Sequence, residues 1–172
     1  MAATKLIGFS AFSGTGKTTL VEKLVLYLKA EGLRVAVIKH DAHDFEIDHE
    51  GKDSWRFAHA GADMVILSSP KKTAVVEQRP HTLWENIGMV QDVDYILVEG
   101  YKQEPIPQIG ICRKATGKGL PFEPEHYLAV VTDDEARQKS SVPCFALDDV
   151  QGIGAFVVEH AKPLEEIEAL SR

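Results

Sequence analysis

The chain has 172 residues, a formal net charge of −7 at pH 7, 44% hydrophobic residues and 26% charged residues. This length favours one domain, residues 1–172, with a full hydrophobic core, and the composition is ordinary for a soluble globular protein. The negative charge argues against nonspecific binding to nucleic acid, which needs a basic face. No apolar run approaches the roughly 18–20 residues that a membrane span requires.

The N-terminus and the cysteines bear on the cellular compartment. Met1–Lys5 passes directly into an apolar run and lacks the pattern of a signal peptide. Cys112 and Cys144 form no C-x-x-C unit, which favours buried free thiols in a reducing environment. We therefore expect a cytoplasmic protein.

A phosphate-binding P-loop follows the first predicted strand, residues 5–10. Ala11–Thr18 reads A-F-S-G-T-G-K-T and fits the Walker A pattern G-x-x-x-x-G-K-[ST], with Ala11 in place of the first glycine. Alanine is small enough to hold that turn, so the departure hardly weakens the match. An ordinary glycine-rich turn is the alternative, and the order of strand, loop and helix disfavours it.

The chemistry of a P-loop requires these residue types. Gly14 and Gly16 let the backbone curl so that N–H groups point at phosphate oxygens, at a helix N-terminus whose dipole favours anions. Lys17 adds positive charge between the phosphates, and the Thr18 hydroxyl can ligate Mg²⁺. The sequence thus predicts the binding of a nucleoside triphosphate.

The residues after the P-loop predict a strand–helix–strand unit. A helix begins near Lys17 and ends before Gly32, with an apolar face at Leu20, Val21, Leu24, Val25 and Leu28. Val35–Ile38 is apolar throughout, which is typical of a parallel strand covered on both faces.

The next segment mixes loops with short elements. Residues 39–52 are polar and predict a loop over the site. A short helix over Asp53–Ala60 and another from Thr82 to about Met89 are indicated by their capping residues. Between them we expect two strands, Val65–Leu67 and Thr73–Glu77, the second as an antiparallel edge.

The second half of the chain predicts three more core strands. They are Tyr95–Val98, Leu128–Val131 and Pro143–Ala146. Residues 101–126 contain four prolines, and we expect an irregular functional loop in which Ile109–Cys112 is the one clear apolar stretch. A closing helix begins near Asp149.

Alternating apolar strands and helices define the fold class as α/β, a mostly parallel sheet flanked by helices. Ligands of such sheets bind at the carboxyl ends of the strands. The segments that leave those ends should therefore converge on one site: Ala11–Thr18, Lys39–Asp48, Glu99–Lys102 and Thr132–Asp134.

Glu99 ends an apolar strand at the position where P-loop proteins place the acid that holds Mg²⁺. The strand fixes its carboxylate at the sheet edge, within reach of Thr18, so that the two share a cation. A strand-terminal glutamate facing solvent is the alternative.

The loop after the second strand offers acids and cations. Asp44, Asp48 and Asp53 are candidates for positioning an attacking water or contacting Mg²⁺, and each is also explained as a solvated acid or a helix cap. Asp48 is the preferred functional candidate. Lys39 and His40 are candidates for contact with phosphate or with a substrate anion.

Histidines in the same loop raise a transition-metal alternative. His40, His43 and His49 lie near the acids, and histidine with carboxylate ligates Zn²⁺ or Ni²⁺. The spacing His40-x-x-His43 without a nearby cysteine is a weak ligand pattern, which disfavours a dedicated site.

Two further groups have open alternatives. An Asp133 carboxylate fixed after a core strand accepts both N1–H and N2–H of guanine, and a turn that caps the next segment explains it equally well. Arg113, Lys114 and Lys118 are candidates for a phosphate clamp, as in a kinase lid, or for solvated loop charges.

Longer motifs make the sequence similar to one family. Besides the P-loop, the chain contains V-I-K-H-D-A-H-D at 37–44, D-x-x-G-K-D-S at 48–54, I-L-V-E-G-Y-K at 96–102 and D-D-V-x-G-I at 148–153. Over nearly its whole length it resembles MobB, the molybdopterin-guanine dinucleotide biosynthesis protein B.

The resemblance implies a P-loop GTP-binding protein of the class that includes dethiobiotin synthetase and metallochaperone GTPases. It implies a homodimer with weak GTP hydrolysis, Mg²⁺ on Thr18 and Glu99, and phosphate contacts from Ser13, Gly14, Thr15, Gly16, Lys17, Thr18 and Thr19. The implied role is assistance to a partner nucleotidyltransferase, MobA, which attaches GMP to molybdopterin. Lys17, stabilising phosphate charge, and Asp48, orienting water, are the candidate catalytic residues.

Two functions of other classes stay open at this point. A small-molecule kinase or ligase would use Arg113, Lys114 and Lys118 as a lid, and would transfer phosphate to a small acceptor. A metal-delivery GTPase would use the histidine loop, and would bind Ni²⁺ or Zn²⁺ in a manner lost on substitution of His40 and His43.

Overall fold

Two units make up the structure, a computed structural model that describes residues 3–41, 45–134 and 141–170. The first, here called the P-loop unit, comprises residues 1–40 and 90–172. The second, the insert unit, comprises residues 41–89. The single domain expected from the sequence stays a prediction, and each unit is described by itself below.

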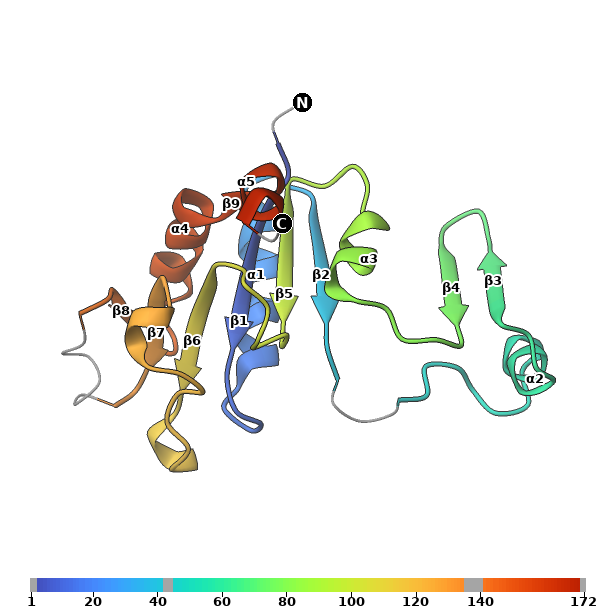
Figure 1. The fold of residues 1–172 in the computed structure, drawn as a ribbon, viewed down its shortest axis with the longest axis horizontal. Coiled ribbons are helices and arrows are strands. Elements are labelled where there is room, and N and C mark those ends of the chain that lie inside the picture. The colour runs from blue at the N-terminus through green and yellow to red at the C-terminus, as the bar shows by residue number, and fades with distance from the viewer. Residues whose placement is uncertain (1–2, 42–44, 135–140, 171–172) are drawn as a thin grey trace. The chain divides into compact units, whose positions relative to one another are not determined.

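A mostly parallel sheet forms the P-loop unit, and its strand order is β2-β5-β1-β6-β7-β8 (Figure 1). The bounds of these strands are β1 Lys5–Ser10, β2 Val35–Lys39, β5 Tyr95–Glu99, β6 Gln108–Cys112, β7 Ala129–Thr132 and β8 Cys144–Phe145. All five pairings along this order are parallel, so the carboxyl ends of the strands share one edge. The predicted α/β fold class is confirmed.

A short strand near the C-terminus completes the pairing of β1. β9 (Lys162–Pro163) runs antiparallel to β1 at Lys5 and Leu6, whereas β6 pairs with β1 only from Gly8 onward. β9 thus pairs with the first residues of β1, and β6 pairs with the last residues of β1. α5 (Leu164–Leu170) follows directly and buries Ile167.

Helices α1 (Lys17–Ala30) and α4 (Val150–His160) pack together with the sheet in one hydrophobic core. The strands contribute alternate residues to that core, as the two-residue period of a strand requires: Ile7, Phe9, Tyr95, Leu97, Ile109, Ile111, Ala129 and Val131. The predicted inward positions Leu20, Val21, Leu24 and Leu28 are buried. Gly32 has a φ of 78°, a conformation that suits a glycine at the end of a helix.

The structure corrects two expectations about strands. The irregular loop expected over 101–126 is interrupted by β6, which is buried along its whole length between β1 and β7. Only short 3₁₀ turns, Lys114–Thr116 and Pro124–His126, follow it in this segment. β2 is the end strand of the sheet order, and it is not covered on both faces, because Val37 is 46% exposed.

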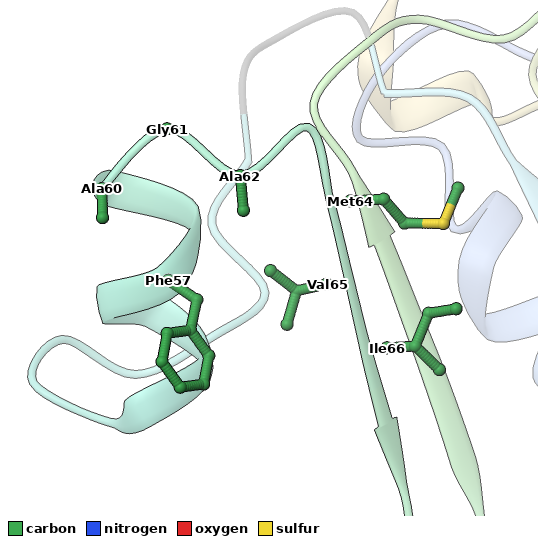
Figure 2. A pocket seen from close by; sticks show the side chains of 7 residues that line it. All are labelled: Phe57, Ala60, Gly61, Ala62, Met64, Val65 and Ile66. Carbon is green, nitrogen blue, oxygen red and sulfur yellow. The ribbon is translucent and has the colours of Figure 1, made fainter.

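The insert unit contains α2 (Asp53–His59), β3 (Met64–Ser68), β4 (Thr73–Glu77) and α3 (Leu83–Gly88). The antiparallel arrangement predicted for Thr73–Glu77 is confirmed, but among the described strands β3 and β4 pair only with each other, in a separate two-stranded sheet. An open hollow of about 610 Å³ lies between α2 and β3 (Figure 2). Val65 points toward α2 there, whereas Met64 and Ile66 point to the other face of β3.

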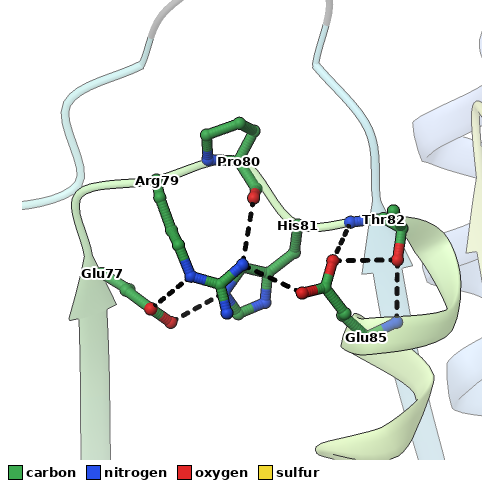
Figure 3. Close-up of polar contacts among 6 residues, drawn as sticks. All are labelled: Glu77, Arg79, Pro80, His81, Thr82 and Glu85. Carbon is green, nitrogen blue, oxygen red and sulfur yellow. Dashed lines mark hydrogen bonds and ion pairs between the residues drawn. The ribbon is translucent and has the colours of Figure 1, made fainter.

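A polar network joins β4 to α3 within the insert unit (Figure 3). Arg79 donates from Nε to Glu77 Oε1 at 2.6 Å and from Nη1 to Glu85 Oε1 at 2.9 Å, and His81 Nε2 lies 2.7 Å from Glu77 Oε2. Thr82 and Glu85 form a capping box at the start of α3. The Thr82 backbone N–H, with help from Arg79, lowers the pKa of Glu85 to about 2.

No helix in the part of the chain that the structure describes is long and apolar enough to cross a membrane.

Candidate functional site

The P-loop begins on a strand whose last residues are fully enclosed. Phe9 and Ser10 of β1 are 0% exposed, and Ala11 is 1% exposed within the core. The buried position of Ala11 needs a small side chain. It does not need the positive φ that favours glycine, because φ is positive at Gly14 and Gly16 but not at Ala11. This explains why alanine replaces the first glycine of the motif.

Hydrogen bonds and glycine torsions shape the rest of the loop. The buried Thr15 hydroxyl donates to the Phe12 carbonyl oxygen at 3.0 Å and closes the turn. Gly14 and Gly16 have φ of 85° and 91°, in the left-handed region that residues with a Cβ avoid. Gly16 is the N-cap of α1, and its carbonyl accepts the first helical bond from Leu20 N–H.

The N-terminus of α1 has the properties of an anion site. Within the described residues, no side chain caps it by a hydrogen bond, and no acid stands in its first turn. A helix of 14 residues therefore directs its N-terminal N–H groups and its positive dipole end into the P-loop. Ser13 and Thr19, expected at the phosphates, are exposed here.

Glu99 meets Lys17 and Thr18 at this helix end. The Thr18 hydroxyl donates to Glu99 Oε1 at 2.8 Å, and Lys17 Nζ lies 3.9 Å from the same oxygen. Glu99 is only 4% exposed. The alternative of a glutamate facing solvent is therefore wrong, and the carboxylate lies beside Thr18, as expected for a shared cation.

The donor set at this position fits Mg²⁺. A hydroxyl and a carboxylate oxygen are hard ligands, and Mg²⁺ in nucleotide sites takes one or two protein oxygens with phosphate oxygens and water for the rest. The 2.8 Å distance between Thr18 Oγ1 and Glu99 Oε1 shows that both oxygens are close enough to ligate one ion. Among the described residues no group of three or more histidine, cysteine, aspartate or glutamate side chains forms a metal site. His43 and Asp44 lie outside the described residues.

Two residues predicted after β2 reach the same sheet edge. Lys39, the last residue of β2, pairs in register with Glu99 and is exposed. His40 N–H donates to the Glu99 carbonyl oxygen at 2.8 Å. Gly100 has a φ of 92°, and a Cβ there would lie 3.1 Å from the His40 carbonyl oxygen. The close approach of the two strand ends thus requires glycine after Glu99.

The sequence did not single out the aromatic and cationic contacts beside this edge. The rings of His40 and Tyr101 lie 4.8 Å apart, and Lys102 Nζ lies 4.9 Å from the centre of the Phe12 ring. Gln108, 6% exposed in β6, holds the turn after Glu99 by donating from Nε2 to the carbonyl oxygens of Tyr101, Lys102 and Glu104. The motif E-G-Y-K was the available signal, but it does not specify these contacts.

Asp133 caps the segment that follows β6. Its Oδ1 accepts from the Lys114 backbone N–H at 2.6 Å, a contact 19 residues back along the chain that neither alternative for this residue included. Its reading of guanine stays a prediction. Arg113 and Lys118 donate to P-loop carbonyl oxygens, Arg113 Nε to Thr15 O at 3.2 Å and Lys118 Nζ to Ser13 O at 3.4 Å.

Asp48 belongs to the insert unit, where it caps its own turn. Its Oδ1 accepts from the His49 backbone N–H at 2.8 Å. A hydrogen bond from Ser54, together with that N–H, holds the pKa of Asp48 below its ordinary value. Asp53 lies at the start of α2 and pairs with Arg56 at 3.7 Å on the surface. Their catalytic roles stay predictions.

A parallel sheet with a glycine-shaped loop between β1 and the uncapped end of α1, and an acid on the adjacent β5, defines a P-loop NTPase fold. The family described as molybdopterin guanine dinucleotide synthesis protein B, MobB, matches residues 6–133. The chain belongs to this family.

Relatives and solved structures agree with this assignment. A Haemophilus influenzae protein, named as a molybdopterin-guanine dinucleotide biosynthesis adapter protein, is 44% identical over 132 residues, 74% of each chain. An Escherichia coli protein with the same name is 36% identical over 166 residues, 90% of this chain and 91% of its own. The crystal structure of Bacillus subtilis MobB superposes with a TM-score of 0.75 at 25% identity, covering 92% of this chain and 98% of that one.

Proposed function

We propose that this protein binds GTP with Mg²⁺ and acts in the cytoplasm as an adapter in the conversion of molybdopterin to its guanine dinucleotide. The observation that carries the nucleotide part is the 2.8 Å contact of Thr18 with Glu99 at the uncapped N-terminus of α1. The adapter role is supported by membership of the family and by the names of the relatives. The partner is a MobA-type nucleotidyltransferase.

The site residues would divide the work as follows. The P-loop N–H groups and Lys17 bind and neutralise the phosphates, and Thr18 with Glu99 holds Mg²⁺, which supplies further charge neutralisation when bound. Lys17 Nζ lies 3.9 Å from Glu99 Oε1, the oxygen that Thr18 also contacts, so its positive charge lies beside the proposed magnesium ligands. Asp48 is the candidate for orienting water, but its carboxylate accepts hydrogen bonds from the His49 N–H and from Ser54 of α2. We expect slow hydrolysis for this reason.

Calorimetry of nucleotide binding tests the proposal. Lys17→Ala should nearly abolish GTP binding, because a central phosphate contact is lost. Lys23→Ala removes one positive charge from an exposed position of the same helix and should bind GTP like the wild type. Wild-type preference for ATP over GTP would remove the guanine assignment, and unchanged affinity of Lys17→Ala would remove the phosphate assignment.

Binding of the purified nucleotidyltransferase tests the adapter role separately. We expect the immobilised chain to retain a MobA-type nucleotidyltransferase in the presence of GTP and Mg²⁺, and to retain less of it with GTP omitted. A chain that binds GTP but does not retain the transferase would keep the nucleotide assignment and refute the adapter role.

Self-association is the second part of the proposal, and the insert unit supplies its surface. An apolar face of the β3–β4 sheet is formed by Met64 and Ile66 together with Val75, which are 46%, 61% and 43% exposed. A two-stranded sheet is marginally stable alone, and a contiguous exposed apolar face marks an interaction site. A second copy of the same hairpin offers a complementary apolar face, so a symmetric homodimer covers both at once.

A further inference from the structure

Arg113 lies against the P-loop although it follows a different strand, β6. Its Nε donates to the Thr15 carbonyl oxygen at 3.2 Å, across 98 residues of sequence. A Cβ built on Gly16 would lie 3.2 Å from Arg113 Nη2, so the guanidinium also approaches the next residue of the loop closely. The left-handed torsion of Gly16 favours glycine, and a side chain there would also press on the end of Arg113.

The backbone of Arg113 is anchored on its far side. The Thr116 hydroxyl donates to the Arg113 carbonyl oxygen at 2.8 Å, and the Lys114 N–H donates to Asp133 Oδ1 at 2.6 Å. Cys112, the preceding residue, is 2% exposed in β6. These contacts hold the backbone of Arg113 in place. Forming the hydrogen bond to Thr15 therefore costs less conformational entropy than it would for an arginine on an unanchored loop.

The hydrogen bond acts on one particular peptide group. In a trans peptide the C=O and N–H lie in one plane and point in opposite directions, and the Thr15 carbonyl shares its peptide with the Gly16 N–H. Holding the carbonyl toward Arg113 therefore turns the Gly16 N–H to the opposite side of the loop. Gly14 and Gly16, on either side of Thr15, have φ of 85° and 91°, and glycine torsions are the ones that let a peptide rotate.

The cation also strengthens the donor at the other end of this peptide. A hydrogen bond from a guanidinium to a carbonyl is charge-assisted, and hydrogen bonds in a chain polarise one another. The Gly16 N–H becomes a better donor to an anion when the Thr15 carbonyl accepts from Arg113. Lys118 makes a longer contact of the same kind, 3.4 Å to the Ser13 carbonyl, whose peptide carries the Gly14 N–H.

We propose that Arg113 is a positioning residue of the phosphate site, which holds the Thr15–Gly16 peptide with its N–H directed at the phosphate chain. This rests on the proposed function only in requiring that the P-loop binds phosphates, and not on which nucleotide carries them. The role differs from a kinase-like lid, because it acts through the hydrogen bond of the guanidinium to the Thr15 carbonyl oxygen of the loop.

The test compares Arg113→Ala, Arg113→Lys and Lys23→Ala for binding of inorganic tripolyphosphate and of Mg-GTP by calorimetry. Loss of one charge-assisted hydrogen bond should weaken both ligands about tenfold in Arg113→Ala. Arg113→Lys should recover part of the loss, since lysine keeps a donor and the charge. Lys23→Ala has the same change in net charge and should bind both ligands like the wild type.

Two further readouts separate positioning from general stability. The melting temperature of unliganded Arg113→Ala should fall by only about 2–4 °C, the cost of one hydrogen bond in a chain of this size, so the variant is folded at the temperature of the calorimetry. Its Gly16 amide should show added line broadening in ¹⁵N relaxation dispersion. Equal tripolyphosphate binding by Arg113→Ala and Lys23→Ala would overturn the role of Arg113. A wild type that binds tripolyphosphate but does not prefer GTP would refute the proposed nucleotide and leave Arg113 in place.

Discussion

The Thr18 hydroxyl donates to Glu99 Oε1 at 2.8 Å, so the first turn of α1 is joined to the end of β5 across the sheet edge. Lys17 approaches the same carboxylate oxygen at 3.9 Å. Thr18, the proposed magnesium ligand, and Lys17, the proposed phosphate-binding lysine, thus share the buried carboxylate of Glu99. Removing the charge of Glu99 should therefore weaken nucleotide binding when Mg²⁺ is present and should not weaken it when Mg²⁺ is absent.

Glu99→Gln should weaken binding of Mg-GTP and leave binding of metal-free GTP as tight as in the wild type or tighter. Glutamine removes the anionic ligand of Mg²⁺ but also frees Lys17 from its ion pair. Calorimetry with excess Mg²⁺ and with a chelator measures the two cases. Glu22→Gln, at an exposed position of α1, is the control. A magnesium dependence equal to that of the wild type would contradict the assignment.

Thr15→Val should destabilise the protein by about 1 kcal/mol and weaken phosphate binding, because the Phe12 carbonyl loses its donor. Valine has nearly the shape of threonine, and Thr15 is 1% exposed, so the change is confined to the hydroxyl. Thr15→Ser keeps the hydroxyl and should retain both properties more fully. Urea unfolding and tripolyphosphate binding are the measurements, and equal behaviour of the two variants would show that the bond is dispensable.

Gly100→Ala should lower the free energy of unfolding by about 1–3 kcal/mol, the cost of a strained backbone torsion. The φ of 92° disfavours any Cβ, and a Cβ would also lie 3.1 Å from the His40 carbonyl oxygen. Gly88→Ala is the matched control, since a Cβ there meets nothing within 4 Å. Denaturant unfolding of the two variants checks this, and similar stabilities would contradict it.

Glu85 should titrate near pH 2 in a carboxyl-detected NMR experiment. Unfolded Glu85 takes up its proton near the ordinary pKa of 4.5, whereas folded Glu85 stays charged down to about 2. Its contribution to stability is therefore complete above pH 4.5 and is lost as the pH falls toward 2. Arg79→Gln should raise the pKa only in part, because the Thr82 N–H remains. A pKa near 4.5 in the wild type would refute the network.

Ile66→Glu should convert the proposed homodimer to a monomer, as measured by light scattering after size-exclusion chromatography. A charge buried in an apolar interface is left unpaired, so association is lost while the fold, checked by circular dichroism, is kept. Leu26→Glu places the same charge at an apolar position of α1 that is 65% exposed, and it should remain dimeric. A wild type that is monomeric at every concentration would remove this part of the proposal.

The local features of the site could be predicted from the sequence. The P-loop, the acid at the end of β5, the cap at Thr82 and the start of a helix near Asp149 each depend on residues close together in the chain, and the structure has them where they were expected. Such features are set by short-range hydrogen bonds and torsions, which leave a clear signature in residue type and spacing.

The features that depend on strand order could not be predicted. An apolar run shows that Val35–Ile38 is a strand but not that it lies at the end of the sheet, which exposes Val37. β6 is short and lies among prolines, so its place beside β1 had no local signal. For the same reason the sequence leaves Arg113 open as a phosphate clamp or a solvated loop charge, because only that pairing brings it to Thr15.

β9 joins the first residues of β1, the strand that precedes the P-loop, to a segment far along the chain. Lys5 and Leu6 at the start of β1 pair with Pro163 and Lys162, and Leu164 N–H donates to the Thr4 carbonyl oxygen. During synthesis the strand that carries the P-loop is made first, yet its pairing is completed by residues made more than 150 positions later. A nascent chain therefore carries the whole P-loop motif, and the strands β5 and β6 that pair with β1, before it contains the residues that complete the pairing at Lys5 and Leu6.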